Sequence, residues 1–506
     1  MASTFHIENF GCRAARADGE AVAALLRNSG ATESLPAEAD VVIVNTCSVT
    51  AEADREARAY IRRTHRQNPD SRIIATGCYA QRAPEELAAL PGVAAVIGNS
   101  HKALTPEIAL QLSLSKPSGH DLSCAENAGN KESGAFARSR TPSPHFVTVR
   151  DLLASRTQSL VLADDTFAHS FLEEASLSLD AQTRPNLKIQ EGCSNRCSFC
   201  VIPQTRGNSR SLSSSAVLSH VRDFVSAGGN ELVFSGINLG RWGRDLDRSS
   251  EPRTLSGLVR EVFDQTALSR LRLSSIEPMD WDSDLISVVQ EFSGTRLARH
   301  AHLPLQSGSD SVLRRMYRRY RPWHYAEKVA ELLRAAGPAL TLGADVMVGF
   351  PGETDREFQE SFDFIGSLPL GYLHLFPFSP RPATRAFELH QENPVPAVVV
   401  DERMAALRTL AAEKVRAHRN RFIGAELPAI TLKAAPALHE AGRTPALSDN
   451  FLPVELNVPF PANQLLHIRI TSIGPDSTLL ASPVLAEAAR SEPQPETFEP
   501  ILENAF

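Results

Sequence analysis

Alternation of short apolar runs with helical patterns is the feature that most restricts the folds open to this chain of 506 residues. Six such runs recur between residues 187 and 376, at 187–190, 231–235, 271–275, 299–304, 339–348 and 371–376. Strands that alternate with helices form parallel sheets, because each parallel pair needs a crossover connection. Six units predict an open, partial TIM-like barrel, with its active residues at the carboxyl ends of the strands.

The first hundred residues show the same alternation on a smaller scale. The β-like runs are 5–10, 41–44, 72–75 and 93–97, and helical patterns cover 18–28 and begin again at about residue 51. This order predicts a small parallel α/β sheet with helices on both faces.

The carboxyl-terminal part follows a different pattern. A long amphipathic helix is predicted over 404–422, and short alternating runs at 429–432, 452–458, 465–473 and 477–482 predict a small antiparallel β-barrel. The segment 113–144 is rich in Ser, Gly, Asn and Pro and is typical of a linker or insertion, whereas 145–182 has no clear pattern. Residues from about 487 are acidic and Pro-rich, which predicts a disordered tail.

Composition narrows the class of protein. The chain begins without a basic segment and has no apolar run long enough to cross a bilayer, so we expect a cytoplasmic protein without a membrane partner. Seven cysteines argue against a disulfide framework and for metal or catalytic roles in a reducing compartment. The net charge of −7 argues only weakly against a nucleic-acid partner, because binding depends on local patches.

Three cysteines, Cys193, Cys197 and Cys200, follow the first barrel strand at C-x3-C-x2-C spacing. A [4Fe-4S] cluster held by three thiolates leaves one iron open to a small molecule, whereas structural zinc takes four protein ligands. Gly192 would allow a sharp turn into this loop, and Phe199 would offer an aromatic edge to a cofactor. A zinc knuckle is the alternative, but no histidine or fourth cysteine lies at the usual paired spacing.

Cys12, Cys47 and Cys78 each follow one of the first three main strands of the amino-terminal sheet. Ligand sites of open α/β sheets lie outside the carboxyl ends of the strands, so these thiols can converge into a second three-cysteine site. The alternative is three buried cysteines that serve as small apolar core residues. Cys124 lies in the Ser-rich segment without a partner at metal-site spacing, which favours a free thiol.

Two groups of arginines could be solvated faces or contacts to RNA. Arg55, Arg58, Arg62 and Arg66 keep helical spacing, and a denser run is interleaved with Tyr317 and Tyr320. This run consists of Arg314, Arg315, Arg318, Arg319 and Arg321. Arginine beside exposed tyrosine suits a single-stranded RNA loop, whose bases stack on rings and guanidinium planes. Arg206 and Arg210 follow the cysteine loop. They could belong to the functional site or form a salt-bridged loop.

The cysteine loop, with Lys188 to Gly192 before it and Val201-Ile202-Pro203 after it, resembles the radical S-adenosylmethionine signature of the methylthiotransferase family. Gly11-Cys12, the segment from Asn45 to Thr50 and the segment from Thr76 to Gln81 are similar to the amino-terminal domain of that family. The segment from Ser448 to Val454 resembles a TRAM domain, an RNA-binding module. The family usually has an asparagine soon after the first cysteine, where this chain has Arg13-Ala14-Ala15-Arg16.

The resemblance implies an enzyme with two [4Fe-4S] clusters and S-adenosylmethionine as cofactors. The six cysteines would be the cluster ligands, and the catalytic groups beyond them stay open. Ser275 and Glu277 would contact the ribose, and Gly349 and Gly352 would let the backbone approach the adenine. The full set of implied cofactor contacts is Phe199, Gly236, Asn238, Ser275, Glu277, Gly349 and Gly352.

The implied organisation has five parts. These are an amino-terminal methylthiotransferase domain at 1–112, an unassigned insertion at 113–183, a radical S-adenosylmethionine domain at 184–423, a TRAM-like domain at 424–486 and a tail at 487–506. We expect the two cysteine sites to be independent of each other, because each belongs to a sheet of its own.

The implied reaction inserts a methylthio group at C2 of threonylcarbamoyladenosine beside the tRNA anticodon. The partners would be the tRNA anticodon stem-loop and a flavodoxin- or ferredoxin-like electron donor. Isopentenyladenosine tRNA and an aspartate of a ribosomal protein are the alternative substrates within the family. An iron-sulfur RNA-binding protein without catalysis is the alternative from another class.

Overall fold

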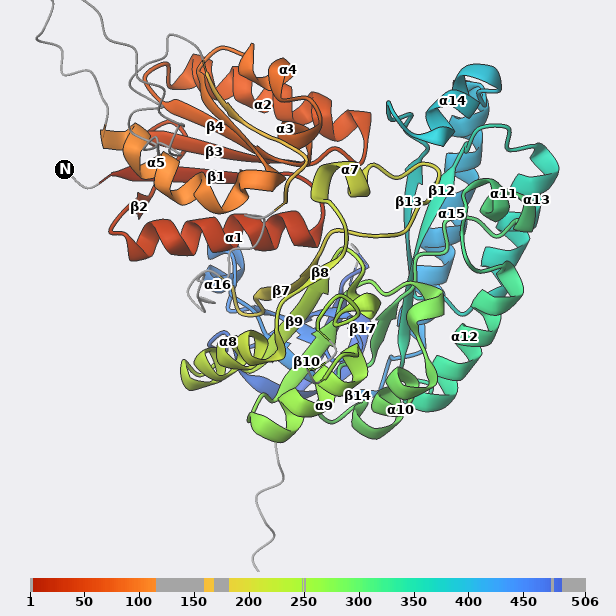
Figure 1. Ribbon diagram of the computed structural model, residues 1–506. Coiled ribbons are helices and arrows are strands. Elements are labelled where there is room, and N and C mark those ends of the chain that lie inside the picture. Colours follow the sequence, from red (N-terminus) through yellow and green to blue (C-terminus); the bar gives the residue numbers. More distant parts are fainter. Residues whose placement is uncertain are drawn as a thin grey trace, which may run out of the picture.

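The computed structural model describes residues 3–114, 159–167, 182–247, 249, 252–474 and 477–484. They form an amino-terminal α/β domain, a partial α/β barrel and a small closed β-barrel (Figure 1). The predicted fold class is therefore confirmed. Cys124 and the tail predicted at 487–506 lie outside the described residues. Within the described part of the chain, no helix has both the length and the apolar character needed to span a membrane.

The amino-terminal sheet is parallel throughout, with strand order β2-β1-β3-β4-β5-β6. In this spatial order the strands are Thr32–Glu33, Thr4–Asn9, Val41–Thr46, Arg72–Gly77, Val93–Gly98 and Leu160–Leu162. The covering helices are α1 (Arg13–Asn28), α2 (Ala51–Gln67), α3 (Cys78–Arg82), α4 (Pro84–Ala88) and α5 (Thr105–Leu114). Separate apolar cores on the two faces confirm helices on both sides of the sheet.

The sequence pattern did not predict strand β6. It belongs to the stretch for which no structure could be predicted, and it pairs in parallel with β5 at the edge of the sheet. The side-chain amide of Gln81 donates to the carbonyl oxygen of Asp164 at 2.7 Å, which holds the chain after β6 against α3. Only three residues form this strand, too few for a visible period.

The partial barrel contains all six predicted strands, arranged as two sheets with the orders β10-β9-β7-β8 and β11-β12-β13. The parallel strands are β7 (Asn186–Glu191), β9 (Glu231–Gly236), β10 (Arg270–Leu273), β11 (His300–His302), β12 (Thr341–Val348) and β13 (Tyr372–Pro377). The antiparallel β8 (Arg210–Ser211) borders β7. A parallel bridge between Ser275 and His302 links the two sheets beyond β10.

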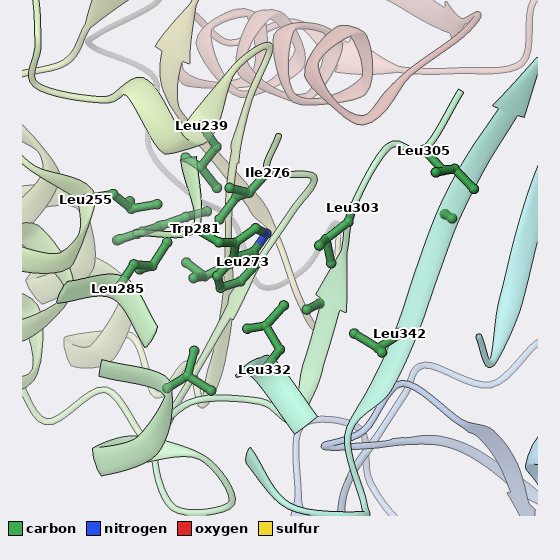
Figure 2. Close-up of a cluster of buried hydrophobic side chains, with 14 of the residues drawn as sticks. Leu239, Leu255, Leu273, Ile276, Trp281, Leu285, Leu303, Leu305, Leu332 and Leu342 are labelled. Atoms are coloured by element: carbon green, nitrogen blue, oxygen red, sulfur yellow. The ribbon is translucent and has the colours of Figure 1, made fainter. Parts of the chain in front are cut away.

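Helices cover the outside of the partial barrel and bury its main apolar core. The longer ones are α8 (Ser214–Ser226), α9 (Leu255–Gln265), α10 (Ser283–Phe292), α12 (Pro322–Ala336) and α13 (Asp355–Ser367). The shorter ones are α7 (Ile202–Arg206), α11 (Asp310–Arg315) and α14 (Arg385–Glu392). Figure 2 shows Leu273, Leu303 and Leu342 of this core with Leu332 of α12. Burying such leucines contributes about 1.5–3 kcal/mol each, so this layer fixes the strand ends that carry the site.

The long helix α15 (Ala397–Asn420) connects the partial barrel to the closed barrel β14-β15-β16-β18-β17. In spatial order, the strands of the closed barrel are β14 (Glu426–Thr431), β15 (Thr444–Ser448), β16 (Pro453–Leu456), β18 (Leu479–Pro483) and β17 (Leu465–Ile473). This closed barrel agrees with the TRAM-like fold implied by the resemblance. The sequence prediction missed β15, because this strand contains Pro445 and ends at the polar Ser448. Arg299 donates to both carboxylate oxygens of Asp449, at 2.6 and 3.0 Å, and attaches this barrel to the larger one.

Helix α1 and the short helix α7 lie between the amino-terminal sheet and the partial barrel (Figure 1). Helix α1 packs against β7 and β9, while α7 packs against α3. The sequence prediction began α1 five residues too late, at 18, because the polar first turn of the helix hides its period.

Candidate functional site

Cys193, Cys197 and Cys200 lie in the loop between β7 and α7, at the carboxyl end of the first barrel strand. Gly192 opens the loop with φ +68°, and a Cβ there would lie 2.1 Å from the carbonyl oxygen of Asn208. The turn predicted for Gly192 is therefore confirmed, since a larger residue would be both strained and blocked.

Hydrogen-bond donors point at the sulfur atoms of this loop. Cys193 Sγ accepts from the backbone N–H of Asn195 at 3.4 Å and from the Asn238 amide at 3.7 Å, and Cys197 Sγ accepts from Arg318 Nη1 at 3.4 Å. Burial and the thiols of Cys197 and Cys193 raise the pKa of Cys200 to about 12. A cationic metal centre binds cysteines as thiolates, and N–H donors stabilise the negative charge on sulfur. The three thiols of this loop, with their N–H donors, therefore suit such a centre.

Arg318 connects this loop to one of the predicted cofactor residues. The buried guanidinium pairs with Glu277 and donates from Nε to the Tyr320 hydroxyl at 3.1 Å. Tyr320 in turn donates to the carbonyl oxygen of Leu305 at 2.7 Å. Cys197, Glu277 and Arg318 line one wall of a cavity of about 360 Å³ that opens between the cysteine loop and the turn after α11.

Cys12, Cys47 and Cys78 converge, as the sequence predicts, because β1, β3 and β4 are neighbours in the sheet. A Cβ on Gly11 would lie 2.6 Å from Cys47 Sγ, so glycine lets the chain before Cys12 approach that sulfur. Burial and the thiols of Cys78 and Cys12 raise the pKa of Cys47 to about 12. Cys12 is exposed, so this second group of thiols has one open side.

Cys78 accepts hydrogen bonds from two buried side chains. The Asn99 amide donates to Cys78 Sγ at 3.4 Å, and Arg206 Nε donates to it at 3.2 Å. Arg206 is the last residue of α7, six positions after Cys200, so it belongs to the other domain. The two cysteine sites therefore share a structural element, and the expectation that they are independent is wrong.

Arg206 is also part of a buried network of charged side chains at the contact between the two domains. Its Nη1 lies 2.7 Å from Glu191 and 3.3 Å from Asp18. Lys102 and Lys188 pair with Asp18, and Lys188 also pairs with Glu191. Burial would raise the pKa of Glu191, but Arg206 and the lysines outweigh it and lower that pKa.

Among the described residues, three cations of the network face two carboxylates, and the side chains of all five are at most 7% exposed. Arg206 Nη2 has no hydrogen-bond partner in that part of the chain. A buried charge is costly unless an opposite charge compensates it. A negatively charged thiolate centre at Cys78 would supply that compensation, so the residues present fit an iron-sulfur cluster at this site.

A cavity of about 260 Å³ lies where the segment after Cys47 meets the cysteine loop of the barrel. Cys200 and Phe199 line it from the barrel side, and Val49 and Thr50, just after Cys47, line it from the amino-terminal domain. The inner face of the barrel supplies Asp345, Met347 and Phe376. Thr50 also caps α2 by accepting from the Ala53 N–H at 3.2 Å, which fixes this wall.

The residues predicted to contact cofactor have other partners within the chain. Ser275 Oγ lies 2.8 Å from His302 Nδ1, and Glu277 pairs with Arg318. Gly236 lies against Gln190, whose side chain accepts from the Asn238 N–H at 2.6 Å. These positions all border the cysteine loop or the barrel interior, and their roles toward a cofactor stay predictions.

Gly349 and Gly352 lie near the carboxyl-terminal helices. The Gly349 N–H donates to Glu353 at 2.9 Å, and a Cβ on Gly349 would lie 2.5 Å from Val400 of α15. The Gly352 N–H donates to the carbonyl oxygen of Asn393 at 2.9 Å. This packing accounts for both glycines, and the predicted approach to adenine stays a prediction.

Most of the second arginine run is engaged in ion pairs rather than free for RNA. Arg314 and Arg321 pair with Asp310, Arg315 pairs with Glu357, and Arg318 pairs with Glu277. Tyr320 is buried, whereas Tyr317 and Arg319 are exposed. Arg206 is salt-bridged, which is the structural alternative considered for it, and it additionally contacts Cys78.

The sequence analysis missed a cluster of polar side chains on the inner face of the barrel. Asp345 Oδ1 lies 3.2 Å from His302 Nε2 and 3.2 Å from His374 Nδ1. The ring of Tyr372 lies beside both histidines, with its centroid 5.2 Å from that of His374 and 5.9 Å from that of His302. The sequence signal that could have predicted this cluster is the alternation of polar with apolar residues on otherwise buried strands.

The three-cysteine loop at the first strand of a partial barrel defines the class of radical S-adenosylmethionine enzymes. Residues 187–365 match the family model described as "Radical SAM superfamily", and residues 4–98 match "Uncharacterized protein family UPF0004". The chain is 31% identical to threonylcarbamoyladenosine tRNA methylthiotransferase of Bacillus subtilis, over 89% of this chain and 90% of the relative.

The chain is also similar to a second tRNA-modifying enzyme by sequence and to one solved structure by fold. The tRNA-2-methylthio-N(6)-dimethylallyladenosine synthase of Geobacter metallireducens is 31% identical over 76% of this chain and 77% of the relative. The structure of the methyltransferase TsrM from Kitasatospora setae has a TM-score of 0.48 and 14% identity, covering 78% of this chain and 75% of that one. On the sequence relatives, this chain belongs to the radical S-adenosylmethionine methylthiotransferase family.

Family membership makes the chain a transferase with S-adenosylmethionine and iron-sulfur clusters as cofactors. Two groups of three cysteines fit two such clusters. Of the seven cysteines, the six described ones are all free of disulfides and all belong to these groups.

Proposed function

We propose that this protein methylthiolates tRNA, at C2 of threonylcarbamoyladenosine beside the anticodon. The C–H bond at that carbon is too inert for acid-base chemistry or nucleophilic displacement. When bound, S-adenosylmethionine and the two clusters supply the hydrogen abstraction and the sulfur and methyl transfer that this bond requires. The protein holds the reacting groups in place.

The observation that carries the proposal is the cavity where the amino-terminal domain meets the cysteine loop of the barrel. Its walls come from Val49 and Thr50, which follow Cys47, and from Phe199 and Cys200 of the barrel loop. A base bound there would lie against Cys200 and beside the segment that follows Cys47. Phe199 and Phe376 supply rings in this cavity on which a base can stack.

The chain's own residues orient the two cysteine groups. Arg318 and Asn238 donate to sulfurs of the barrel loop, while Arg206 and Asn99 donate to Cys78. Such hydrogen bonds fix the side-chain rotamers of the ligands and stabilise negative charge on sulfur. Arg381 of the barrel pairs with Asp54 of α2 at 2.7 Å and holds the cavity walls together.

Recognition of the RNA is assigned to surfaces outside the cavity. The closed β-barrel of residues 426–483 corresponds in fold to an RNA-binding module, and Tyr317 and Arg319 are exposed beside the cysteine loop. Exposed Arg62 and Arg66 of α2 extend the basic surface. A flavodoxin- or ferredoxin-like donor completes the proposal, because reductive cleavage of S-adenosylmethionine consumes an electron.

Mass spectrometry of tRNA nucleosides from a strain lacking this protein tests the proposal. We expect the loss of 2-methylthio-threonylcarbamoyladenosine, its unmethylthiolated precursor in its place, and restoration by the intact gene. Loss of the isopentenyladenosine product instead would change the substrate, and an unchanged nucleoside profile would contradict a tRNA-modifying role.

A further inference from the structure

A patch of rings and guanidinium groups lies on the inner face of the barrel, beyond the cavity that Phe199 and Cys200 line. Gly343, Asp345 and Met347 of β12 alternate onto one face, as do Tyr372, His374 and Phe376 of β13. Asp345, Met347 and Phe376 line the cavity, so Gly343 and Tyr372 continue the same face away from it. A Cβ on Gly343 would lie 2.1 Å from the Tyr372 ring, which confirms that this ring covers Gly343.

Phe451 of the closed barrel ends this row of rings. It adopts φ +67°, in a turn attached to the larger barrel through Asp449 and Arg299. Its ring centroid lies 4.3 Å from that of His300 and 5.6 Å from that of Tyr372. A positive φ is strained for a phenylalanine, so the surrounding contacts must hold the ring in this position.

Two arginines from different domains lie over the Phe451 ring. The guanidinium carbon of Arg13 is 5.5 Å from the ring centroid, and that of Arg272 is 5.3 Å from it. Arg13 is the first residue of α1 and directly follows Cys12. The side chain that stands where this chain departs from the family pattern therefore lies over a ring of the closed barrel.

The patch has positive charge that the described residues do not neutralise. Arg13 has no hydrogen bond or ion pair to another described residue, and it is exposed to solvent. Arg272 is fully buried, pairs with Glu231 at 3.0 Å and leaves Nη1 without a hydrogen-bond partner. The neighbouring Asp345 is already paired with His302 and His374.

The exposed guanidinium of Arg13 is suited to a carboxylate, which can accept from it, and the buried charge of Arg272 over the same ring adds to the positive potential. The distance along β12 from Met347 to Gly343 is four residues, or about 13 Å, so the patch lies within reach of a base with an extended substituent. An apolar isopentenyl group would leave the Arg13 guanidinium without a partner.

We infer that Arg13 binds the carboxylate of the threonylcarbamoyl substituent, with Arg272 adding positive potential, and so selects this modified adenosine over uncharged ones. Phe451 and Tyr372 support the substituent from the side. This inference rests on the proposed function and assigns it a specificity-determining residue. It also gives the closed barrel a part in the substrate site, through Phe451, in addition to RNA binding.

The test uses full-length, anaerobically reconstituted protein and three synthetic anticodon stem-loop RNAs. They carry threonylcarbamoyladenosine, the same nucleoside with its carboxylate converted to a methylamide, or isopentenyladenosine. The variants are Arg13→Gln, Arg13→Lys and, as a matched control, Arg16→Gln. Arg16 lies one turn further along α1, is exposed and pairs only weakly with Glu20, at 3.4 Å. Iron content, RNA affinity without turnover, KM and kcat are measured for each.

We expect Arg13→Gln to weaken binding and raise KM about tenfold or more for the carboxylate RNA, because a charge-assisted hydrogen bond is lost. Affinity for the methylamide RNA should hardly change, Arg13→Lys should recover part of the difference, and Arg16→Gln should behave as wild type. Equal weakening on all RNAs, or none on any, would overturn the inference alone. Failure of the wild-type protein to modify the carboxylate RNA would overturn the proposed function as well.

Discussion

The two cysteine groups are built alike around their sulfurs but differ in what surrounds them. Each receives one guanidinium: Arg318 donates to Cys197, and Arg206 donates to Cys78. Arg318 comes from the same barrel as its cysteine, and its acidic partner Glu277 borders an open cavity. Arg206 crosses from one domain to the other and is fixed in a fully buried network of five charges.

This difference indicates that the barrel site is structurally complete in one domain, whereas the amino-terminal site depends on the domain contact. Its strands place Cys12, Cys47 and Cys78, but a barrel residue supplies a main donor to Cys78. Damage to the domain contact should therefore affect the amino-terminal site first. The barrel site should be damaged only by changes within its own domain.

Cys197→Ala should have the largest effect, because it removes a ligand and the acceptor of the Arg318 hydrogen bond. Two thiolates cannot hold a cubane with a defined open iron, so both reductive cleavage of S-adenosylmethionine and product formation should be abolished. Liquid chromatography of deoxyadenosine and methylthio nucleoside measures both. If the variant still forms deoxyadenosine, the barrel loop is not the cofactor-cleaving site.

Cys47→Ala should separate the two sites. Product should disappear and iron content should fall by about half, since each cluster needs its full set of thiolates. Deoxyadenosine formation should persist, because the barrel loop is intact. Iron analysis and the same chromatography follow these changes. Full iron content with wild-type product would mean that the amino-terminal cysteines are ordinary core residues.

Arg206→Met should weaken the amino-terminal site through the domain contact. Methionine removes the buried donor of Glu191 and Cys78, and leaving buried acceptors without their donor costs about 1–3 kcal/mol. Thermal unfolding should shift downward, and iron should be lost from the amino-terminal site while deoxyadenosine formation remains.

Arg222→Met is the control for this change, since Arg222 is an exposed arginine of α8 bonded only to Gln265 at 2.7 Å. It should leave both the unfolding temperature and the iron content unchanged. Equal behaviour of the two variants would show that the contact between Arg206 and Cys78 has no structural importance.

Glu20→Gln should have the smallest effect, and it tests the domain contact by pH, because Glu20 of α1 accepts from the side-chain amide of Gln182, just before the first barrel strand. Burial raises the pKa of Glu20 from 4.5 to about 7. The folded state therefore holds a proton that the unfolded state releases above pH 4.5, so this group's contribution to stability is lost as the pH rises through 7. Glutamine stays neutral, so the variant should melt about 2 °C higher than wild type at pH 8 and equally at pH 4.

Exposed Glu52 of α2, changed to glutamine, provides the control for Glu20. Differential scanning fluorimetry across this pH range measures both variants. A stabilisation of Glu20→Gln that does not depend on pH would contradict the role of burial at the domain contact.

Much of the architecture followed from pattern alone. The six barrel strands, the amino-terminal sheet and the convergence of its cysteines were predictable, because apolar periodicity fixes strands and parallel strands share one ligand-binding edge. The three-residue β6, the strand β15 and the true start of α1 were not, because short elements and polar first turns have no period to detect.

By itself, the sequence determined which residues can carry the chemistry: six cysteines at strand ends, with glycine before Cys12, Cys78 and Cys193. Only the tertiary structure decided what these groups contact. It brought Arg206 to Cys78, Arg318 to Cys197 and Arg13 to Phe451, pairs separated by more than a hundred residues. The physical reason is that an arginine's partner depends on domain packing, and the local sequence around a charge has no record of that packing.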